Sequence, residues 1–242
     1  MIPARLEPSL LRVSPDGGMV LAVMHSRQRV ADEEDVVAIE WRVPGEPVVF
    51  TLGIGPWISV GWNDAGLSVT GNELAPNDER VGIPRLLQVR DVLTRRNLAD
   101  AVEAVLHPAR ASSYNWVLAH ASGEVANVEG SATTAAVSEP EDGVLTHTNH
   151  YVDPAMIGFE RSANASGSAV RLRREAELVA ERIDLREALC DHENAPNSIC
   201  RHGDEEGTKT VFWCVADLAG GEIAFGRGNP CASTAQTYRF EQ

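Results

Sequence analysis

The chain has 242 residues and a formal net charge of −14, from 21 basic and 35 acidic side chains. This charge disfavours nucleic acids and anionic membrane surfaces as partners, because their phosphates would repel it. Hydrophobic residues make up 43% of the sequence, which suits a packed core. No apolar run reaches the roughly 18 residues of a membrane-spanning helix, and the N-terminus lacks a signal-peptide layout. We therefore expect a cytoplasmic globular protein with a single domain over residues 1–242.

The first third of the chain carries the pattern of β-strands. Short apolar runs alternate with turn residues such as Pro15-Asp16-Gly17-Gly18, Pro44-Gly45 and Asn63-Asp64-Ala65-Gly66. These connections are too short for crossovers, so antiparallel hairpins are expected. A polar stretch over residues 27–35 predicts a solvated loop. The expected strands cover residues 19–24, 35–43, 48–52, 57–61 and 67–70.

Two helices and further strands follow. Pro84 suits a first helical position, and an apolar stripe continues from it to residue 96. A second helix over 98–105 ends before Pro108, and a third is expected to be capped by Ser168 and to run to Ile183. Such alternation of strands and helices predicts a layered α+β architecture. The stripe consists of Leu86, Leu87, Val89, Val92 and Leu93, and the remaining strands cover 114–119, 124–129, 133–137, 144–148, 209–217, 222–225 and 236–240.

All four cysteines lie in the last quarter of the chain, which predicts free thiols and no disulfide scaffold. Two of them form the pairs Cys190-x-His192 and Cys200-x-His202, whose side chains are of the type that binds zinc. With one intervening residue, each pair has a short bite that strains the angle at a metal. We therefore expect these residues to be hydrogen-bonding groups in a loop, with no metal and no cofactor. Cys231, beside a turn, is interpreted as structural.

A polar cluster follows the apolar strand at residue 145. It reads His147-Thr148-Asn149-His150-Tyr151, and alternation along a strand puts His147 and Asn149 on one face. Thr148 and His150 then share the other face. An asparagine amide can stabilise an oxyanion, whereas the alternative is a strand end whose polar groups satisfy a turn. Asn72, at the end of another strand, is either a site residue or a turn former.

These residues belong to a longer ordered set that resembles the acyl-CoA:6-aminopenicillanic acid acyltransferase family, also called isopenicillin N acyltransferase-like. The resemblance extends from about Ser14 to Phe240, and it accounts for the Cys/His pairs without a metal. The set comprises Gly61-x-Asn63-x-x-Gly66-Leu67, Asn72, Gly82-Ile83-Pro84-Arg85, Arg90, Ser113-x-Asn115, Ser122-Gly123, Glu129, His147-Thr148-Asn149-His150, residues 166–171, Leu189-Cys190-Asp191-His192, Ser198-Ile199-Cys200-Arg201-His202, Thr210-Val211 and Gly228-x-Pro230-Cys231.

The resemblance implies an N-terminal-nucleophile (Ntn) hydrolase fold, a four-layered αββα sandwich. Members of such families cleave their own chain to expose a cysteine, whose thiolate attacks an amide or a thioester. The α-amine of the cysteine acts as the base, because its pKa of about 7.7–8.0 lies near working pH. The acyl group then passes to water or to an amine. In this chain Asn149 matches the oxyanion-hole asparagine, and Thr210 is expected near the nucleophile.

The sequence departs from the family at its N-terminal end. The nucleophilic cysteine is expected within residues 4–9, which contain no cysteine, and the family's Asn-x-Asp-Trp segment is absent from residues 23–28. Three accounts stay open. Ser9 replaces the thiol after cleavage behind Pro8, or other groups such as His25, His150 or Asn149 support an altered chemistry. In the third account, the protein is an inactive homologue that binds a small molecule or a partner subunit.

The favoured function is an acyltransferase or amidohydrolase acting on a small acylated amine or acyl-thioester, with an altered or lost nucleophile. Catalytic candidates are Ser9, Asn149, His150 and Thr210. Candidates for substrate binding are His25, Trp57, Asn63 and Asn72, where Trp57 is either a pocket wall or a core residue. The sequence leaves open whether the protein forms a homo-oligomer.

Overall fold

The structure is a computed structural model that describes residues 5–13, 19–28, 33–55, 57–161, 165–203 and 208–241. In the first two strands, and at Trp57, Ala165, Ser166 and Thr208, it describes the backbone alone. The turn predicted at residues 15–18 lies outside the described residues.

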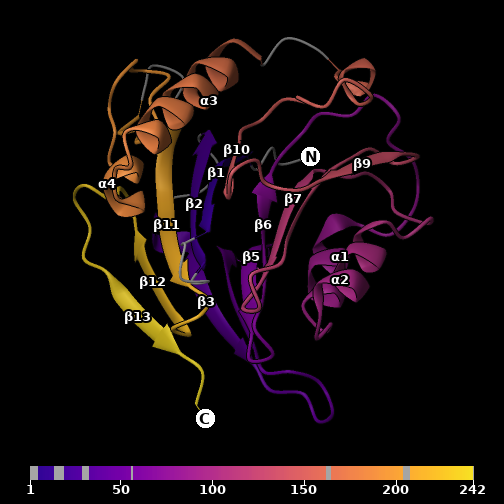
Figure 1. Cartoon of the computed structure of the whole chain (residues 1–242). Coiled ribbons are helices and arrows are strands. Elements are labelled where there is room, and N and C mark those ends of the chain that lie inside the picture. Colours follow the sequence, from indigo (N-terminus) through magenta and orange to yellow (C-terminus); the bar gives the residue numbers. More distant parts are fainter. Residues whose placement is uncertain are drawn as a thin grey trace.

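Two antiparallel sheets form the centre of the fold (Figure 1). Sheet A has six strands in the order β10-β1-β2-β11-β12-β13, and sheet B has seven strands in the order β3 to β9. Sheet A contains β10 (Val144–His147), β1 (Arg5–Val13), β2 (Met19–Gln28), β11 (Thr208–Asp217), β12 (Glu222–Arg227) and β13 (Gln236–Arg239). Sheet B contains β3 (Val36–Trp41), β4 (Val49–Ile54), β5 (Trp57–Asn63), β6 (Leu67–Asn72), β7 (Asn115–His120), β8 (Val125–Gly130) and β9 (Ala135–Ser138).

Helices cover the outer faces of both sheets (Figure 1). α1 (Arg85–Val92) and α2 (Leu98–Val105) pack on sheet B, while α3 (Ala165–Ala180) and α4 (Leu185–Leu189) pack on sheet A. Short 3-10 helices span Glu33–Asp35 and Ile157–Phe159. The layers therefore follow the order helix, sheet, sheet, helix, and the predicted αββα sandwich is confirmed. Among the described residues, no helix has the length and apolar character needed to cross a membrane.

β11 shows how one strand supplies two cores. Trp213 faces the cluster beneath α4, while Phe212 and Cys214 face the cluster between the sheets. This alternation is the ordinary consequence of the two-residue repeat of a strand. Val211 also faces the space between the sheets, because the pairing of β11 with β2 shifts register between Thr210 and Phe212. The strand predicted over residues 209–217 is thus confirmed, with a bulge near its start.

β1 is absent from the strands predicted by hydrophobic alternation, and only the family resemblance implies a strand before residue 14. Its pairing with β2 joins Glu7 to Met24 and Ser9 to Val23, so Pro8 is the extra residue of a bulge. Proline lacks a backbone N–H and is tolerated in strands at such irregularities. The polar loop expected over residues 27–35 is also partly wrong, because β2 continues to Gln28 and a 3-10 helix begins at Glu33.

The helix predictions need four corrections. Pro84 precedes α1 instead of opening it, and Leu87 from the predicted stripe has 59% of its surface exposed. The buried face of α1 includes Arg85, whose guanidinium lies over the rings of Tyr114 and Trp116. Ser168 does not cap α3, since the helix begins at Ala165. α4 was not predicted; the side chain of Asp184 caps it by accepting N–H bonds from Arg186 and Glu187.

Two leucines near α1 test this packing. Leu93 is fully buried, so Leu93→Ala should lower the free energy of unfolding by about 2–5 kcal/mol. Leu87→Ala should change it by less than about 0.5 kcal/mol, because Leu87 projects into solvent. Urea unfolding of both variants measures the difference. Equal losses in the free energy of unfolding would contradict the burial of Leu93 and the exposure of Leu87.

Candidate functional site

A buried polar contact joins the two sheets at the end of β10. The Nε2 atom of His147 lies 3.0 Å from Oε1 of Glu129 on β8, and its Nδ1 lies 3.1 Å from Oδ1 of Asn72 on β6. Asn115 on β7 donates to the same Asn72 oxygen at 3.1 Å. None of these four side chains is more than 1% exposed. Buried polar groups of this kind need their partners, so the contact fixes β10 against sheet B.

Glu129 also holds the chain that follows β10. Its Oε2 accepts the backbone N–H groups of Val152 and Asp153, both at 3.1 Å. Between them and His147, the Tyr151 hydroxyl donates to the carbonyl of Gly130 at 2.7 Å. Burial raises the pKa of Tyr151, which keeps the hydroxyl protonated as a donor. The segment 148–153 is therefore tied to β8 at both ends.

Ser168 of α3 anchors the other face of this segment. Its Oγ accepts the backbone N–H of Asn149 at 2.7 Å and lies 2.9 Å from Oγ1 of Thr148. The Nδ1 atom of His150 lies 2.7 Å from the same Oγ. His147 faces sheet B, and Thr148 and His150 contact Ser168 on α3. The alternation predicted through His150 does not extend to Asn149, because β10 ends at His147 and the Asn149 side chain contacts both α3 and the residue after β6. Ser168 is thus a junction between α3 and the polar segment.

The side-chain amide of Asn149 is oriented from both ends. Its Oδ1 accepts from Arg171 on α3 at 2.9 Å, and its Nδ2 donates to the carbonyl of Glu73 at 3.1 Å. Arg171 is 3% exposed, so its guanidinium lies inside the protein. These contacts direct the N–H side of the amide toward the end of β6. An amide held in this way is a preorganised donor.

Thr210 lies in the same row of sheet A as Arg5, the first described residue of β1, with β2 between them. In sheet A, Thr210 pairs with Ser26, which pairs in turn with Arg5. The Thr210 side chain accepts the N–H of Arg201 at 3.1 Å, and the Thr210 N–H donates to the Arg201 carbonyl at 2.9 Å. Thr210 therefore lies at the same end of sheet A as the segment that follows His147.

Ser9 lies further along the sheet. Its backbone pairs with His147 on one side and with Val23 on the other. Ser26, in the row of Thr210, is three residues from Val23, which corresponds to roughly 10 Å along a strand. The structure therefore does not bring the backbones of Ser9 and Thr210 side by side.

Three further candidates are placed by their backbone alone. His25 pairs with Leu6 and Phe212, next to the row of Thr210, and Trp57 pairs with Ile54. The side chains of Ser9, His25 and Trp57 lie outside the described part of the chain.

Asn63 is not brought to this cluster. Its Oδ1 accepts the N–H groups of Ala65 and Leu67 within the predicted hairpin turn. Its Nδ2 donates to the carbonyls of Leu93 and Arg95, which fastens α1 to sheet B. Asn72 lies at the opposite end of β6, five residues after Leu67 and thus roughly 17 Å away along the strand. Of these two asparagines, Asn72 alone contacts the polar cluster.

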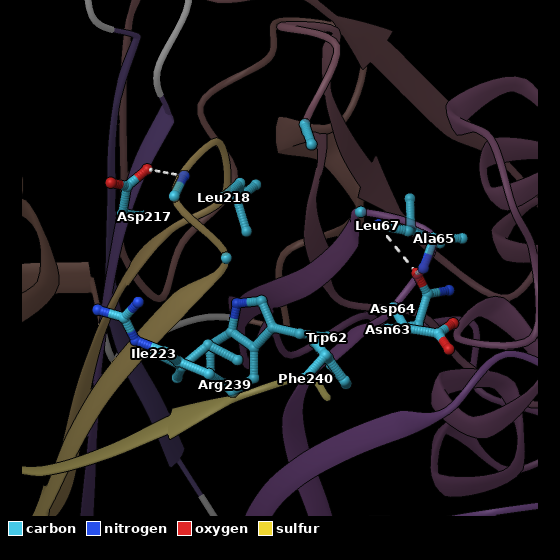
Figure 2. Close-up of a pocket in the computed structure, with 14 residues that line it drawn as sticks. Trp62, Asn63, Asp64, Ala65, Leu67, Asp217, Leu218, Ile223, Arg239 and Phe240 are labelled. Carbon is cyan, nitrogen blue, oxygen red and sulfur yellow. Dashed lines mark hydrogen bonds between the residues drawn. The ribbon is translucent and has the colours of Figure 1, made fainter. Parts of the chain in front are cut away.

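The cavity in Figure 2 lies at the Asn63 end of the sandwich. It has a volume of about 360 Å³ and lies between the β5–β6 turn and the β11–β12 turn. Trp62, Ile223 and Phe240 give it an apolar wall. Asp217 of this cavity and Thr210 occupy opposite ends of β11, so the cavity is distant from the polar cluster.

Two parts of the site were not assigned from the sequence. Ser168 was expected only as a cap, and Arg171 had no role of its own. Their spacing of three residues on one helix is a usable signal, because such residues share a helix face. Glu129 entered only through the family resemblance, since a single acidic residue at the end of a strand has no distinctive pattern.

The architecture is similar to that of solved acyl-amide hydrolases. An arginine-to-leucine variant of conjugated bile acid hydrolase from Clostridium perfringens matches with a TM-score of 0.62, 12% identity and 97% coverage of each chain. Penicillin V acylase from Agrobacterium tumefaciens matches with a TM-score of 0.55 and 11% identity, over 96% of this chain and 86% of that one. The fold is that of the Ntn hydrolases. A comparison with curated protein sequences finds no match.

The sequence model of the acyl-coenzyme A:6-aminopenicillanic acid acyl-transferase family matches residues 55–231, almost three quarters of the chain. The protein belongs to this family, and the predicted enzyme class, an acyltransferase or amide hydrolase, is confirmed. The matched region begins after β1 and β2, the two strands in which the sequence departs from the family pattern.

Glu129→Gln tests the polar contact. All the neighbours of Glu129 named above donate hydrogen bonds to it, whereas glutamine would present an NH₂ group to some of these donors. The free energy of unfolding should fall by about 1–3 kcal/mol. Glu103→Gln, at an exposed site on α2, should leave it unchanged. Chemical denaturation measures the free energy of unfolding of both variants. A Glu129→Gln protein as stable as wild type would contradict the role of Glu129 as a buried hydrogen-bond acceptor.

The pH dependence of stability tests His150. Burial lowers its pKa below the ordinary 6.5, the charges of His147 and Arg171 lower it further, and Glu129 opposes them. The unfolded chain therefore binds a proton at this site more readily than the folded one. Stability should fall as pH decreases from about 6.5 toward the folded-state pKa. Thermal unfolding of wild type and His150→Gln over this pH window should show a shallower decrease of the thermal midpoint in the variant. Identical slopes of midpoint against pH would refute a contribution of His150.

Proposed function

We propose that the protein cleaves or forms a small acyl amide beside Asn149 and His150, at the end of sheet A that also carries Thr210, without a cysteine nucleophile. The observation that carries this proposal is the Asn149 amide, fixed between Arg171 and the Glu73 carbonyl. Its N–H side is suited to the oxygen of an acyl group as negative charge develops there.

His150 is the proposed general base. Its lowered pKa favours the neutral ring at neutral pH, so a ring nitrogen can accept a proton. In hydrolysis, His150 takes a proton from water while the water oxygen bonds to the acyl carbon. The resulting oxyanion faces Asn149. The C–N bond then breaks, and the departing amine takes the proton from His150. In acyl transfer, an amine replaces the water.

Direct attack by water or an amine fits the sequence better than an acyl-enzyme. No cysteine precedes Cys190, and Ser9 lies within β1 with a paired strand on each side. For Ser9 to become an N-terminal nucleophile, cleavage behind Pro8 would have to remove residues that pair with β2. This supports altered chemistry over an N-terminal serine.

The substrate class is a small N-acyl amine or an acyl-thioester with an amine acceptor. The net charge of −14 supports a protein without a nucleic-acid partner, and the free cysteines support a cytoplasmic location.

Turnover of a panel of N-acyl amines, and of acyl-CoA thioesters with amines, tests the proposal. Asn149→Ala should lower kcat by about 100- to 1,000-fold, the usual effect of removing one oxyanion donor. Asn77→Ala is the matched control, because Asn77 is exposed and donates to Gly158 outside the site. It should retain wild-type kcat.

Two results would contradict this mechanism. Absence of turnover by wild type across the panel would favour the inactive binding homologue. Intact mass and N-terminal sequencing of the purified protein give the second test. A chain beginning at Ser9 would assign the reaction to an N-terminal serine, whereas residues retained before Ser9 support attack by water or an amine.

A further inference from the structure

The side chains of two histidines and two cysteines converge on one point near α4. The Nε2 atoms of His192 and His202 are 2.9 Å apart, and the Sγ atoms of Cys200 and Cys231 are 3.6 Å apart. Cys231 Sγ lies 3.5 Å from Nε2 of His192 and 3.2 Å from Nε2 of His202, while Cys200 Sγ lies 3.9 Å from the latter. All four atoms lie within 4.8 Å of one another.

These separations are close to the edges of a tetrahedral zinc site. Zinc–sulfur bonds of about 2.3 Å and zinc–nitrogen bonds of about 2.0–2.1 Å place ligand atoms about 3.3–3.8 Å apart at tetrahedral angles. A disulfide between Cys200 and Cys231 would need its sulfurs about 2.05 Å apart, well below the observed 3.6 Å. The arrangement therefore matches four ligands around one ion better than a covalent sulfur pair.

A neighbouring amide supports this arrangement. Asn229 Nδ2 donates to Cys200 Sγ at 3.3 Å and to the carbonyl of Arg201 at 2.7 Å. Hydrogen bonds to ligand atoms are the usual outer support of a metal site, because they orient the ligand. Cys200 itself is 1% exposed, so the ligand that receives this bond is also the most buried of the four.

The geometry also removes the objection raised by the sequence. A site made of two Cys-x-His pairs would have two short bites, but Cys190 is not among the four converging residues. Cys231, which follows β12, takes its place, and His192 contributes from a separate segment after α4. Only Cys200 and His202 are separated by a single residue.

We propose that His192, Cys200, His202 and Cys231 bind one Zn²⁺ ion as a structural site. Two imidazoles and two thiolates are ligands that zinc prefers, and two thiolates balance its charge. Four protein ligands leave no coordination position for a substrate, which distinguishes this site from a catalytic zinc centre.

The ion would connect the loop before β11 with the chain after β12. Arg201 lies between Cys200 and His202, and its backbone forms two hydrogen bonds with Thr210. Zinc binding therefore stabilises the segment beside Thr210 without contacting the proposed site of acyl chemistry.

Metal analysis of the full-length protein, purified with reductant from zinc-supplemented cells, tests the proposal. Wild type should contain about one zinc per chain, whereas Cys231→Ser and His202→Ala should retain less than about a tenth of it. Cys190→Ser is the matched control, because Cys190 is nearby but outside the four, and it should keep the full content. Asn229→Ala should bind zinc about 10- to 100-fold more weakly.

Wild-type protein supplies two further readouts that do not depend on folding of a variant or on acyl activity. Replacement of zinc by Co²⁺ should give the absorption of a tetrahedral cobalt–thiolate centre, and chelation should lower the thermal midpoint. Wild type without stoichiometric metal, equal zinc loss in Cys190→Ser, or a Cys200–Cys231 disulfide detected as a loss of two hydrogens would each overturn the proposal.

Discussion

The contact of His147 with Glu129 and Asn72 is the constraint on which the candidate site depends. Elsewhere the two sheets meet through apolar side chains, such as Phe50 from sheet B and Phe212 from sheet A. At the end of β10 they meet through buried hydrogen bonds. An apolar interface tolerates small shifts, whereas a buried polar pair loses much of its energy when its geometry changes. The two sheets are therefore held in one relative position beside Asn149.

This constraint explains why the segment 148–153 holds its shape without being a strand. Glu129 secures it from sheet B, and Ser168 and Arg171 secure it from α3. Its side chains therefore need no support from solvent or from a substrate. A site that is arranged before its ligand binds avoids the ordering cost that would otherwise weaken binding and slow the reaction.

The layers and most strands were predictable from the sequence, because alternation and turn residues report directly on a two-sided sheet. β1 was missed since Pro8 interrupts its pattern, and its bulge becomes evident only when β2 pairs with it. Within the site, strand alternation predicted one shared face for His147 and Asn149, but β10 ends at His147 and Asn149 contacts α3 through Arg171. The partners of these residues come from α3, β6 and β8. Such partners are set by tertiary packing, which no local pattern encodes.

The order of the strands has a consequence for a chain that is synthesised from its N-terminus. All seven strands of sheet B come from one uninterrupted stretch that ends at Ser138. Sheet A instead joins β2 to β11, where Ser26 pairs with Thr210 across 184 positions of sequence. Pairing across such a separation carries a large loop-closure entropy and is slow. Sheet B can therefore form as soon as residues up to Ser138 have been synthesised, whereas the candidate site can be completed only after β11 has emerged and paired with β2.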